Sequence, residues 1–175
     1  MAEIQGMEHK NLSIELLKKI LNDEIRSRVR KNFIQSKKMS EMLENAIRKY
    51  QNNLLTTAQV IEELIKLAQE IREDDKRGES FGLTDDELAF YDALSVNKSA
   101  LEVLGDKQLR DLSRVLVERV KANTSIDWTI KESVQAKLRV IVRRTLRQFG
   151  YPPDAQLLAT ENVLKQAELL ADDMK

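Results

Sequence analysis

Apolar residues recur every three or four positions along almost the whole chain, and the apolar–polar alternation typical of a half-buried strand is absent. A period of about 3.6 residues places the apolar side chains on one face of an α-helix. The first such stretch covers about residues 11–32, and two more cover about 37–51 and 56–71. The pattern predicts that the N-terminal part of the chain, residues 1–77, contains three amphipathic helices.

Residues 73–82 interrupt this periodicity with a run of charged residues and two glycines, Gly78 and Gly82. Glycine and clustered polar residues are typical of turns and loops. We therefore expect a loop over residues 74–82. It would separate the N-terminal part from a C-terminal helical part, residues 83–175, with both parts packed in one compact unit.

The C-terminal part begins with a helix-start signal. Thr84 and Glu87 have the spacing of a capping box, in which the hydroxyl and the carboxylate accept hydrogen bonds from backbone amides that the helix leaves free. Farther along the chain, Gly105 is expected to end a short helical turn. Asp106 is then expected to cap the helix that follows.

A long basic helix is predicted over about residues 127–149. Gly150 stands where a glycine commonly ends a helix, and Pro152 and Pro153 prevent its continuation. Asp154 is expected to cap a last helix. With five glycines and two prolines in 175 residues, the sequence predicts an all-α protein, an irregular bundle of about seven helices with no sheet.

The charge of the chain is balanced in total but uneven along its length. The sequence has 29 basic and 29 acidic side chains, which argues against a protein that binds polyanions with its whole surface. Residues 51–106 carry 5 basic and 13 acidic groups, whereas residues 107–151 carry 11 basic and 4 acidic groups. Such blocks indicate charge-matched packing or separate faces with separate partners.

Most of the residues that catalysis requires are missing. There is no cysteine, His9 is the only histidine, and no phosphate-binding glycine motif is present. The absence of cysteine excludes thiolate sites, and a single histidine excludes multi-histidine metal sites. His9, which would have to serve as the base of any Ser-His-Asp triad, lies near a chain end, where we expect a solvated surface histidine. Carboxylates cluster at residues 73–75, 85–87 and 172–173, but a magnesium site needs carboxylates that converge from different elements. We expect no catalytic, cofactor-binding or metal-binding residue in this chain.

The best candidate for a functional surface is a set of basic side chains on the predicted 127–149 helix. Arg139, Arg143 and Arg147 are spaced four residues apart and form a stripe on one face. Arg144 and Lys137 lie on the adjoining faces. These side chains could bind phosphate groups, dock on an acidic partner, pair with the acidic middle of this chain, or form a plainly solvated face.

Three further features keep alternatives open. Trp128 and Phe149 are expected to pin the ends of the basic helix to the core. Met39, Met42 and Leu43 give another predicted helix a soft apolar face, so a self-association module is an alternative. A second, weaker basic cluster spreads around the first helix and consists of Arg26, Arg28, Arg30 and Lys31.

The sequence shows no membrane or export signal. No apolar run approaches the roughly 20 residues of a membrane span. The first residues lack both the basic and the apolar region of a signal peptide. We expect a soluble, cytoplasmic protein that does not bind membranes.

Several stretches, read letter by letter, go beyond a generic helical pattern. Two of them are LTDDELAFYDAL at residues 83–94 and RRTLRQFGYPPD at 143–154. The others are residues 8–12, 16–25, 35–44, 48–52, 60–64 and 155–170. They are spread over nearly the whole chain, and they resemble the C-terminal helical region of the restriction (R, motor) subunit of type I restriction–modification enzymes.

This resemblance implies a parent protein that is an ATP-dependent type I site-specific deoxyribonuclease. Its nuclease and helicase-like ATPase domains would bind Mg²⁺ and ATP elsewhere, because this sequence has none of their motifs. The first residues are compatible with a helix, which fits a fragment of a longer protein. We expect a non-catalytic assembly domain that binds the methyltransferase and specificity subunits. DNA contact through the basic helix and self-association are the alternatives.

Overall fold

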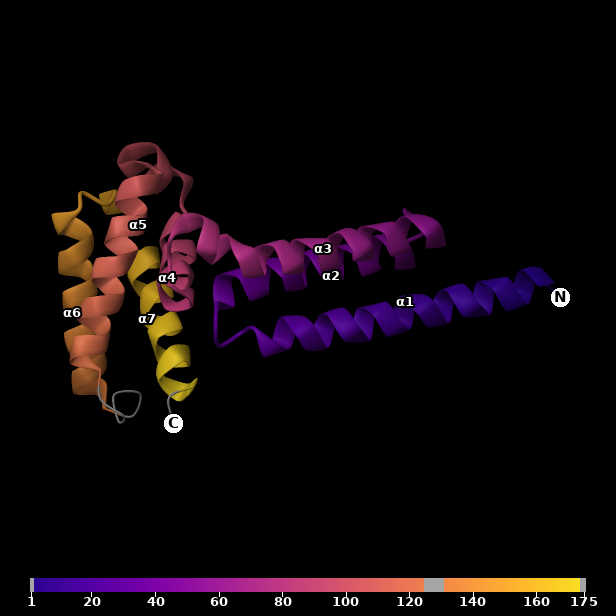
Figure 1. Cartoon of the computed structure of the whole chain (residues 1–175), viewed down its shortest axis with the longest axis horizontal. Helices are drawn as coiled ribbons and strands as arrows, with labels where there is room; N and C mark the ends of the chain where they lie inside the picture. Colours follow the sequence, from indigo (N-terminus) through magenta and orange to yellow (C-terminus); the bar gives the residue numbers. More distant parts are fainter. Residues whose placement is uncertain (1, 125–130, 174–175) are drawn as a thin grey trace. The chain divides into compact units, whose positions relative to one another are not determined.

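The computed structural model describes residues 2–124 and 131–173, except for the side chains of residues 2–10 and 173. Seven α-helices and one 3-10 turn account for the regular structure of these residues, and no strand occurs among them (Figure 1). The all-α class and the expected number of helices are confirmed. The helices are α1 (Ala2–Ser27), α2 (Phe33–Gln51), α3 (Thr57–Phe81), α4 (Asp85–Ser95), α5 (Lys98–Asn123), α6 (Glu132–Gln148) and α7 (Gln156–Asp173), with η1 at Pro153–Ala155.

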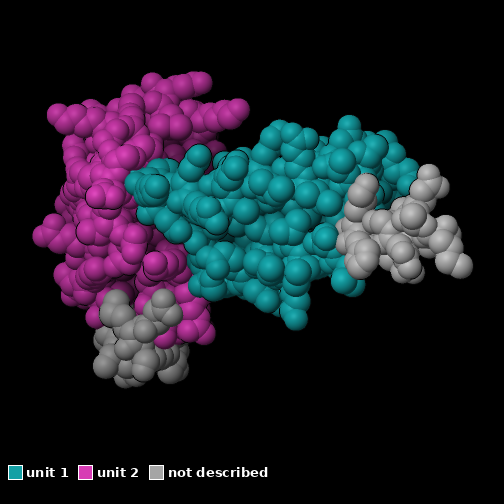
Figure 2. Space-filling view, turned by 45° about the vertical axis from the view of Figure 1, so that its right-hand side comes forward, with its two compact units in different colours: residues 1–29, 35–77 teal, residues 30–34, 78–175 magenta. Residues whose placement is uncertain are grey.

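The chain divides into two compact units, which Figure 2 shows in different colours. Unit 1 comprises residues 1–29 and 35–77, and unit 2 comprises residues 30–34 and 78–175. The connector between α1 and α2 therefore belongs to the C-terminal unit, although it lies in the N-terminal part of the sequence.

Unit 1 has its own hydrophobic core, formed by α1, α2 and the part of α3 up to Arg77. The buried residues of each helix recur at helical spacing, so each helix turns one apolar face to the other two. Met39 and Leu43 lie in this core and Met42 packs against it. The apolar face of α2 that suggested self-association is thus used inside unit 1. The core residues are Ile14, Leu21, Ile25, Met39, Leu43, Ala46, Ile47, Val60, Leu64, Leu67 and Ile71.

The loop expected over residues 74–82 is wrong, because α3 continues to Phe81. The helix ends in a Schellman motif, in which Gly82 has a φ of 67° and the Leu83 amide donates to the Gly78 carbonyl at 2.9 Å. A Cβ at Gly78 would lie 3.2 Å from the Leu83 carbonyl oxygen. The glycine in the last turn therefore marks a close approach of two backbone segments at a helix end.

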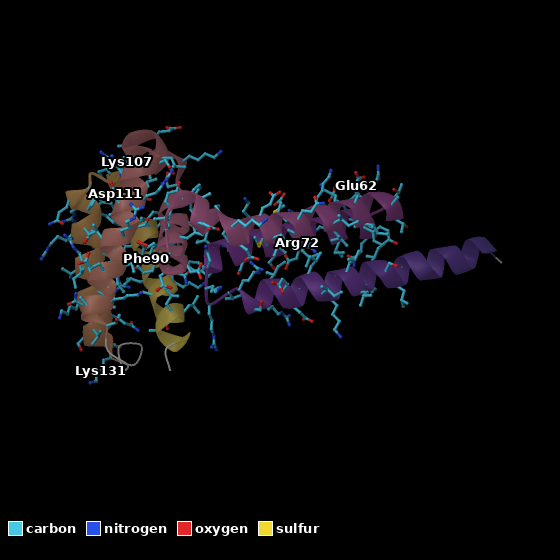
Figure 3. All side chains as sticks on the ribbon, viewed as in Figure 1. Glu62, Arg72, Phe90, Lys107, Asp111 and Lys131 are labelled. Carbon is cyan, nitrogen blue, oxygen red and sulfur yellow. The ribbon has the colours of Figure 1, made fainter. Side chains whose placement is uncertain are left out.

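Unit 2 is built around α4, α5, α6 and α7. Phe90 of α4, labelled in Figure 3, is one of its largest buried side chains. The Thr84–Glu87 capping box is present as predicted, with both reciprocal hydrogen bonds formed. Gly150 ends α6 with a φ of 75°, again as predicted. Phe149 packs against the core, whereas Trp128 lies outside the described residues.

Two expected caps are replaced by other interactions. Gly105 breaks the regular geometry of α5 with a φ of 78°, but the Asp106 carboxylate accepts hydrogen bonds from the Tyr91 hydroxyl at 2.5 Å and from the Arg110 guanidinium. It thereby joins α4 to α5. Asp154 lies inside the 3-10 turn that precedes α7, because Pro153 stands in the first position of that turn.

A buried glutamine holds the α1–α2 connector on unit 2. The side-chain oxygen of Gln166 accepts a hydrogen bond from the Phe33 amide at 2.9 Å, and its nitrogen donates to the carbonyls of Arg30 and Lys31 at 3.0 and 3.3 Å. A second bond joins Asn32 to the buried carboxylate of Asp92 at 2.6 Å. Since these bonds take up connector backbone groups, α1 ends at Ser27, before residue 32 where the periodicity placed its end.

The buried hydroxyl of Tyr151 gives a testable pH dependence. It donates to the Leu94 carbonyl at 2.7 Å, and burial raises the pKa of Tyr151 from 10.0 to about 12. Because the protonated form is favoured in the folded state, we expect the free energy of unfolding to fall as the pH rises from 10 towards 12. In Tyr151→Phe this decrease should be smaller but not absent, since the pKa of Tyr91 is also raised to about 12.

The measurement is chemical denaturation of both proteins at pH 8, 10, 11 and 12. At pH 8 the variant should be less stable by about 1 kcal/mol, the usual contribution of one hydrogen bond. Equal pH slopes for the two proteins would show that the Tyr151 hydroxyl does not titrate as the fold requires.

Candidate functional site

Helix α6 positions the basic side chains that the sequence singled out. Its buried face consists of Leu138, Val142, Thr145 and Leu146. Packing of this face against the core turns the opposite face outward, and α6 contacts both α5 and α7. Figure 3 shows nitrogen-tipped side chains that extend away from α6 into solvent. The helix has five basic residues and one acidic residue, Glu132 in its first turn.

We define the basic face of α6 as Lys137, Arg143, Arg144 and Arg147, all of which are exposed. At 100° per residue, these four positions lie within about 60° of Val140, the centre of the outward face. None of the four forms an ion pair or hydrogen bond with another residue that the structure describes. The basic face is therefore uncompensated within unit 2.

Arg139 does not share this environment, although the sequence grouped it with the same stripe. It lies at the edge of the outward face, and its guanidinium bonds both carboxylate oxygens of Glu161 on α7 at 3.1 and 3.4 Å. Arg139 and Glu161 line a groove between α6 and α7. This ion pair is half-exposed, so it contributes little to stability. It nevertheless gives the Arg139 guanidinium a partner within unit 2.

Some other cations of unit 2 are paired with carboxylates. Lys121 pairs with Asp86 at 2.7 Å, and Lys31 pairs with Asp85 at 3.6 Å. Both carboxylates belong to the acidic first turn of α4. The acidic middle of the chain thus neutralises cations of α5 and of the connector. It does not neutralise the described α6 cations, which removes one of the interpretations that the sequence left open.

Two residues of the second basic cluster, Arg28 and Lys31, form ion pairs within the fold. Arg28 bonds Glu24 at 2.7 Å and Asp75 at 2.5 Å within unit 1, and the hydrogen bond to Asp75 is the main reason why its pKa is raised. Lys31 pairs within unit 2 as described above. The four residues are divided between the two compact units, and two of them are already paired, so the cluster is not a candidate binding site.

A further surface was missed in the sequence. Leu12, Leu16 and Ile20 lie four residues apart on α1, and their exposed fractions are 71%, 59% and 54%. We call them the apolar stripe of α1. They lie on the side of the helix opposite Ile14 and Leu21, which are in the core. The i, i+4, i+8 spacing is present in the sequence, but spacing alone does not show which of two apolar faces of one helix lies in the core.

The acidic clusters have structural roles rather than the geometry of a metal site. Asp75 bonds Arg28, Asp74 bonds Arg77 at 3.2 Å, and Glu87 completes the capping box of α4. Within the part of the chain that the structure describes, no three carboxylate or imidazole side chains are grouped so that they could hold a metal ion. The side chain of His9 is not among those described.

The perturbed pKa values of Tyr91 and Asp106 in unit 2 belong to a packing contact. The pKa of Tyr91 is raised to about 12 by burial and by its hydrogen bond to Asp106, and the pKa of Asp106 is lowered by its hydrogen bond to Arg110. The Arg110 guanidinium also lies 5.0 Å from the centre of the Phe81 ring. This cluster joins α4, α5 and the end of α3 inside unit 2. Its polar groups bond one another, so packing within the fold accounts for the shifted pKa values.

The described helices include no candidate for a membrane-spanning segment. No described helix combines the length and the apolar character that crossing a membrane requires.

Comparisons with known proteins identify relatives of this chain. A family model described as "Type I restriction enzyme HindI endonuclease subunit-like, C-terminal" matches residues 1–173. The chain is 39% identical over 165 residues to the type I restriction enzyme HindI endonuclease subunit of Haemophilus influenzae, and 39% identical over 157 residues to the putative type I restriction enzyme MjaIXP endonuclease subunit of Methanocaldococcus jannaschii. These matches cover 94% and 86% of the chain but only 16% and 14% of the relatives. No solved structure matches the chain.

Proposed function

Because this chain belongs to the family of C-terminal regions of HindI-like type I restriction endonuclease subunits, we propose that it is the assembly domain of such a subunit. It docks the DNA-translocating and cleaving subunit onto the methyltransferase–specificity core of the same restriction system. The chain supplies no catalytic residue in this proposal. The nuclease and ATPase sites, with their Mg²⁺ and ATP, belong to other parts of the longer protein.

The apolar stripe of α1 carries this proposal. Leu12 and Leu16 are large aliphatic side chains that stay more than half exposed although the helix already buries another apolar face in the core of unit 1. A continuous apolar stripe in water is unfavourable, and such patches commonly mark protein–protein contacts. Lys19 and Asp23 beside the stripe are exposed and oppositely charged, as is common at the polar rim of an interface.

A generic self-association module is less well supported. The apolar face of α2 that suggested it lies in the core of unit 1, as described above. A second copy of the chain could still cover the stripe of α1. The experiment therefore measures self-association together with binding to the core subunits.

The experiment compares two matched double variants in binding to the purified methyltransferase–specificity complex. Leu12→Ser with Leu16→Ser removes two side chains of the stripe. The control, Leu54→Ser with Ile65→Ser, removes two exposed apolar side chains elsewhere in unit 1. Burial of one leucine contributes about 1.5–3 kcal/mol, so the stripe variant should bind about 100-fold more weakly or worse. The control should bind within about threefold of the wild type.

Two outcomes would contradict the proposal. Equal binding by the stripe variant and the control would remove the stripe from the interface. A wild-type chain that forms dimers through the stripe, and does not bind the core subunits, would assign this surface to a second copy. Circular dichroism of each variant shows whether the helical fold is retained.

A further inference from the structure

The basic face of α6 is independent of the apolar stripe, since it belongs to the other compact unit. Its four cations are exposed and have no partner among the described residues, whereas Lys121, Arg110 and Arg139 of unit 2 pair with carboxylates. No acidic side chain of α6 lies beyond Glu132 in its first turn. Like charges held this close repel one another unless an anion or salt compensates them.

The composition of this face favours a polyanion over a protein partner. Protein interfaces have an apolar centre from which charged residues are depleted. On α6 the only large apolar side chain that is exposed is Val140, with an exposed fraction of 54%, and it is surrounded by cations. Three of the four cations are arginines, whose planar guanidinium groups match the oxygen geometry of phosphate. The face therefore fits a row of phosphates better than an apolar protein surface.

The geometry fits a duplex better than a single strand. Lys137 and Arg147 are ten residues apart, so the face extends over about 15 Å of helix. A DNA duplex carries one negative charge per about 1.7 Å of its axis, which places several phosphates within reach of a face of this length. Proteins that bind single strands usually stack bases on aromatic side chains, and α6 has no aromatic residue from Glu132 to Gln148.

We infer that the basic face of α6 binds the phosphate backbone of duplex DNA without sequence preference. Gln148, at the end of α6, is engaged by Arg119 through a hydrogen bond of 2.8 Å. The face thus lacks a free amide that could read adenine in a bidentate manner. Its arginines could in principle read guanine, so equal affinity for two different duplex sequences is part of the inference. The contacts of the face are electrostatic. This surface lies outside the docking interface proposed above, and it does not require that interface to be correct.

The affinity of the chain for duplex DNA should fall steeply as the salt concentration rises. Four phosphate contacts give a slope of about −3.6 for the logarithm of the association constant against the logarithm of salt concentration, or about a 100-fold loss between 50 and 200 mM. The measurement uses fluorescence anisotropy with the full chain and a labelled 30-base-pair duplex of arbitrary sequence. A second duplex sequence and a single strand of the same length are run in parallel.

The variants separate a local contact from the effect of net charge. Arg143→Gln, Arg144→Gln and Arg147→Gln together remove three cations from the basic face. The control removes three exposed cations from unit 1 through Arg48→Gln, Lys49→Gln and Lys66→Gln. We expect the α6 variant to reduce the slope by about 2.7 and to weaken binding at 50 mM salt by roughly 10-fold per cation. The control should keep both the slope and most of the affinity.

Four results would overturn the inference. One is an absence of duplex binding at 50 mM salt, and another is equal loss in the two triple variants. The third is an α6 variant that keeps its DNA affinity but loses binding to the methyltransferase–specificity complex, which would assign the face to an acidic protein surface. Preference for the single strand would show that the contact does not depend on duplex geometry.

Discussion

Replacement of Gln166 by leucine should lower the free energy of unfolding by about 3 kcal/mol. The leucine fills a similar volume, but the Phe33 amide then loses its acceptor and the Arg30 and Lys31 carbonyls lose their donor. Gln166 is fully buried, and a buried polar group without a partner costs about 1–3 kcal/mol. The value is measured by urea denaturation at neutral pH, and Glu168→Gln on the exposed side of α7 is the control.

This prediction tests the way in which residues 30–34 are joined to unit 2. The control should change stability by less than about 0.5 kcal/mol, as is usual for surface substitutions. If Gln166→Leu were as stable as the wild type, the bonds between Gln166 and the connector could not be a main support of this part of the fold.

Leu146→Ala should destabilise the protein by about 3 kcal/mol, whereas Val140→Ala on the same helix should have almost no effect. Leu146 is completely buried in the core of unit 2, and removal of a buried leucine leaves a cavity that costs about 2–5 kcal/mol. Val140 is exposed, and alanine has the higher helix propensity. The contrast determines which face of α6 is turned to the core and which carries the cations.

Thermal denaturation followed by circular dichroism is sufficient for this comparison. The midpoint for Leu146→Ala should fall by several degrees, while that for Val140→Ala should stay within about one degree of the wild type. Comparable losses in the two variants would mean that α6 is rotated relative to the arrangement described above. The basic face would then be wrongly defined.

Local signals in the sequence were sufficient for much of this fold. The capping box at Thr84 and the end of α6 at Gly150 depend on residues within a few positions of one another. Such features follow from helix geometry and from the hydrogen bonds that a helix end leaves unmade. They were predicted from the sequence for this reason.

Features that depend on distant residues were not predictable in the same way. Gly78 suggested a loop, but its role is to admit the Leu83 carbonyl near the end of a continuing helix. Gln166 bonds a backbone amide 133 positions away, and nothing in the local pattern indicates that partner. Arg139 has the same four-residue spacing as Arg143 and Arg147, and only its ion pair with Glu161 of α7 distinguishes it from them.

The two candidate surfaces were likewise predictable only in part from the sequence. The positions of the basic residues on one helix were evident from spacing, but only the packing of α6 showed which cations lack partners. The apolar stripe of α1 was visible as spacing too, yet Leu12, Leu16 and Ile20 could be assigned to a surface only after Ile14 and Leu21 were found in the core.

If this chain is an assembly domain, it binds the methyltransferase–specificity core of its own restriction system. Sedimentation velocity of the wild-type chain mixed with that purified complex, without DNA and at physiological salt, tests it most directly. We predict a saturable complex that sediments faster than either component and has a fixed stoichiometry. If the two components sediment independently at every ratio, while the chain alone remains helical, the assembly function proposed for this domain is wrong.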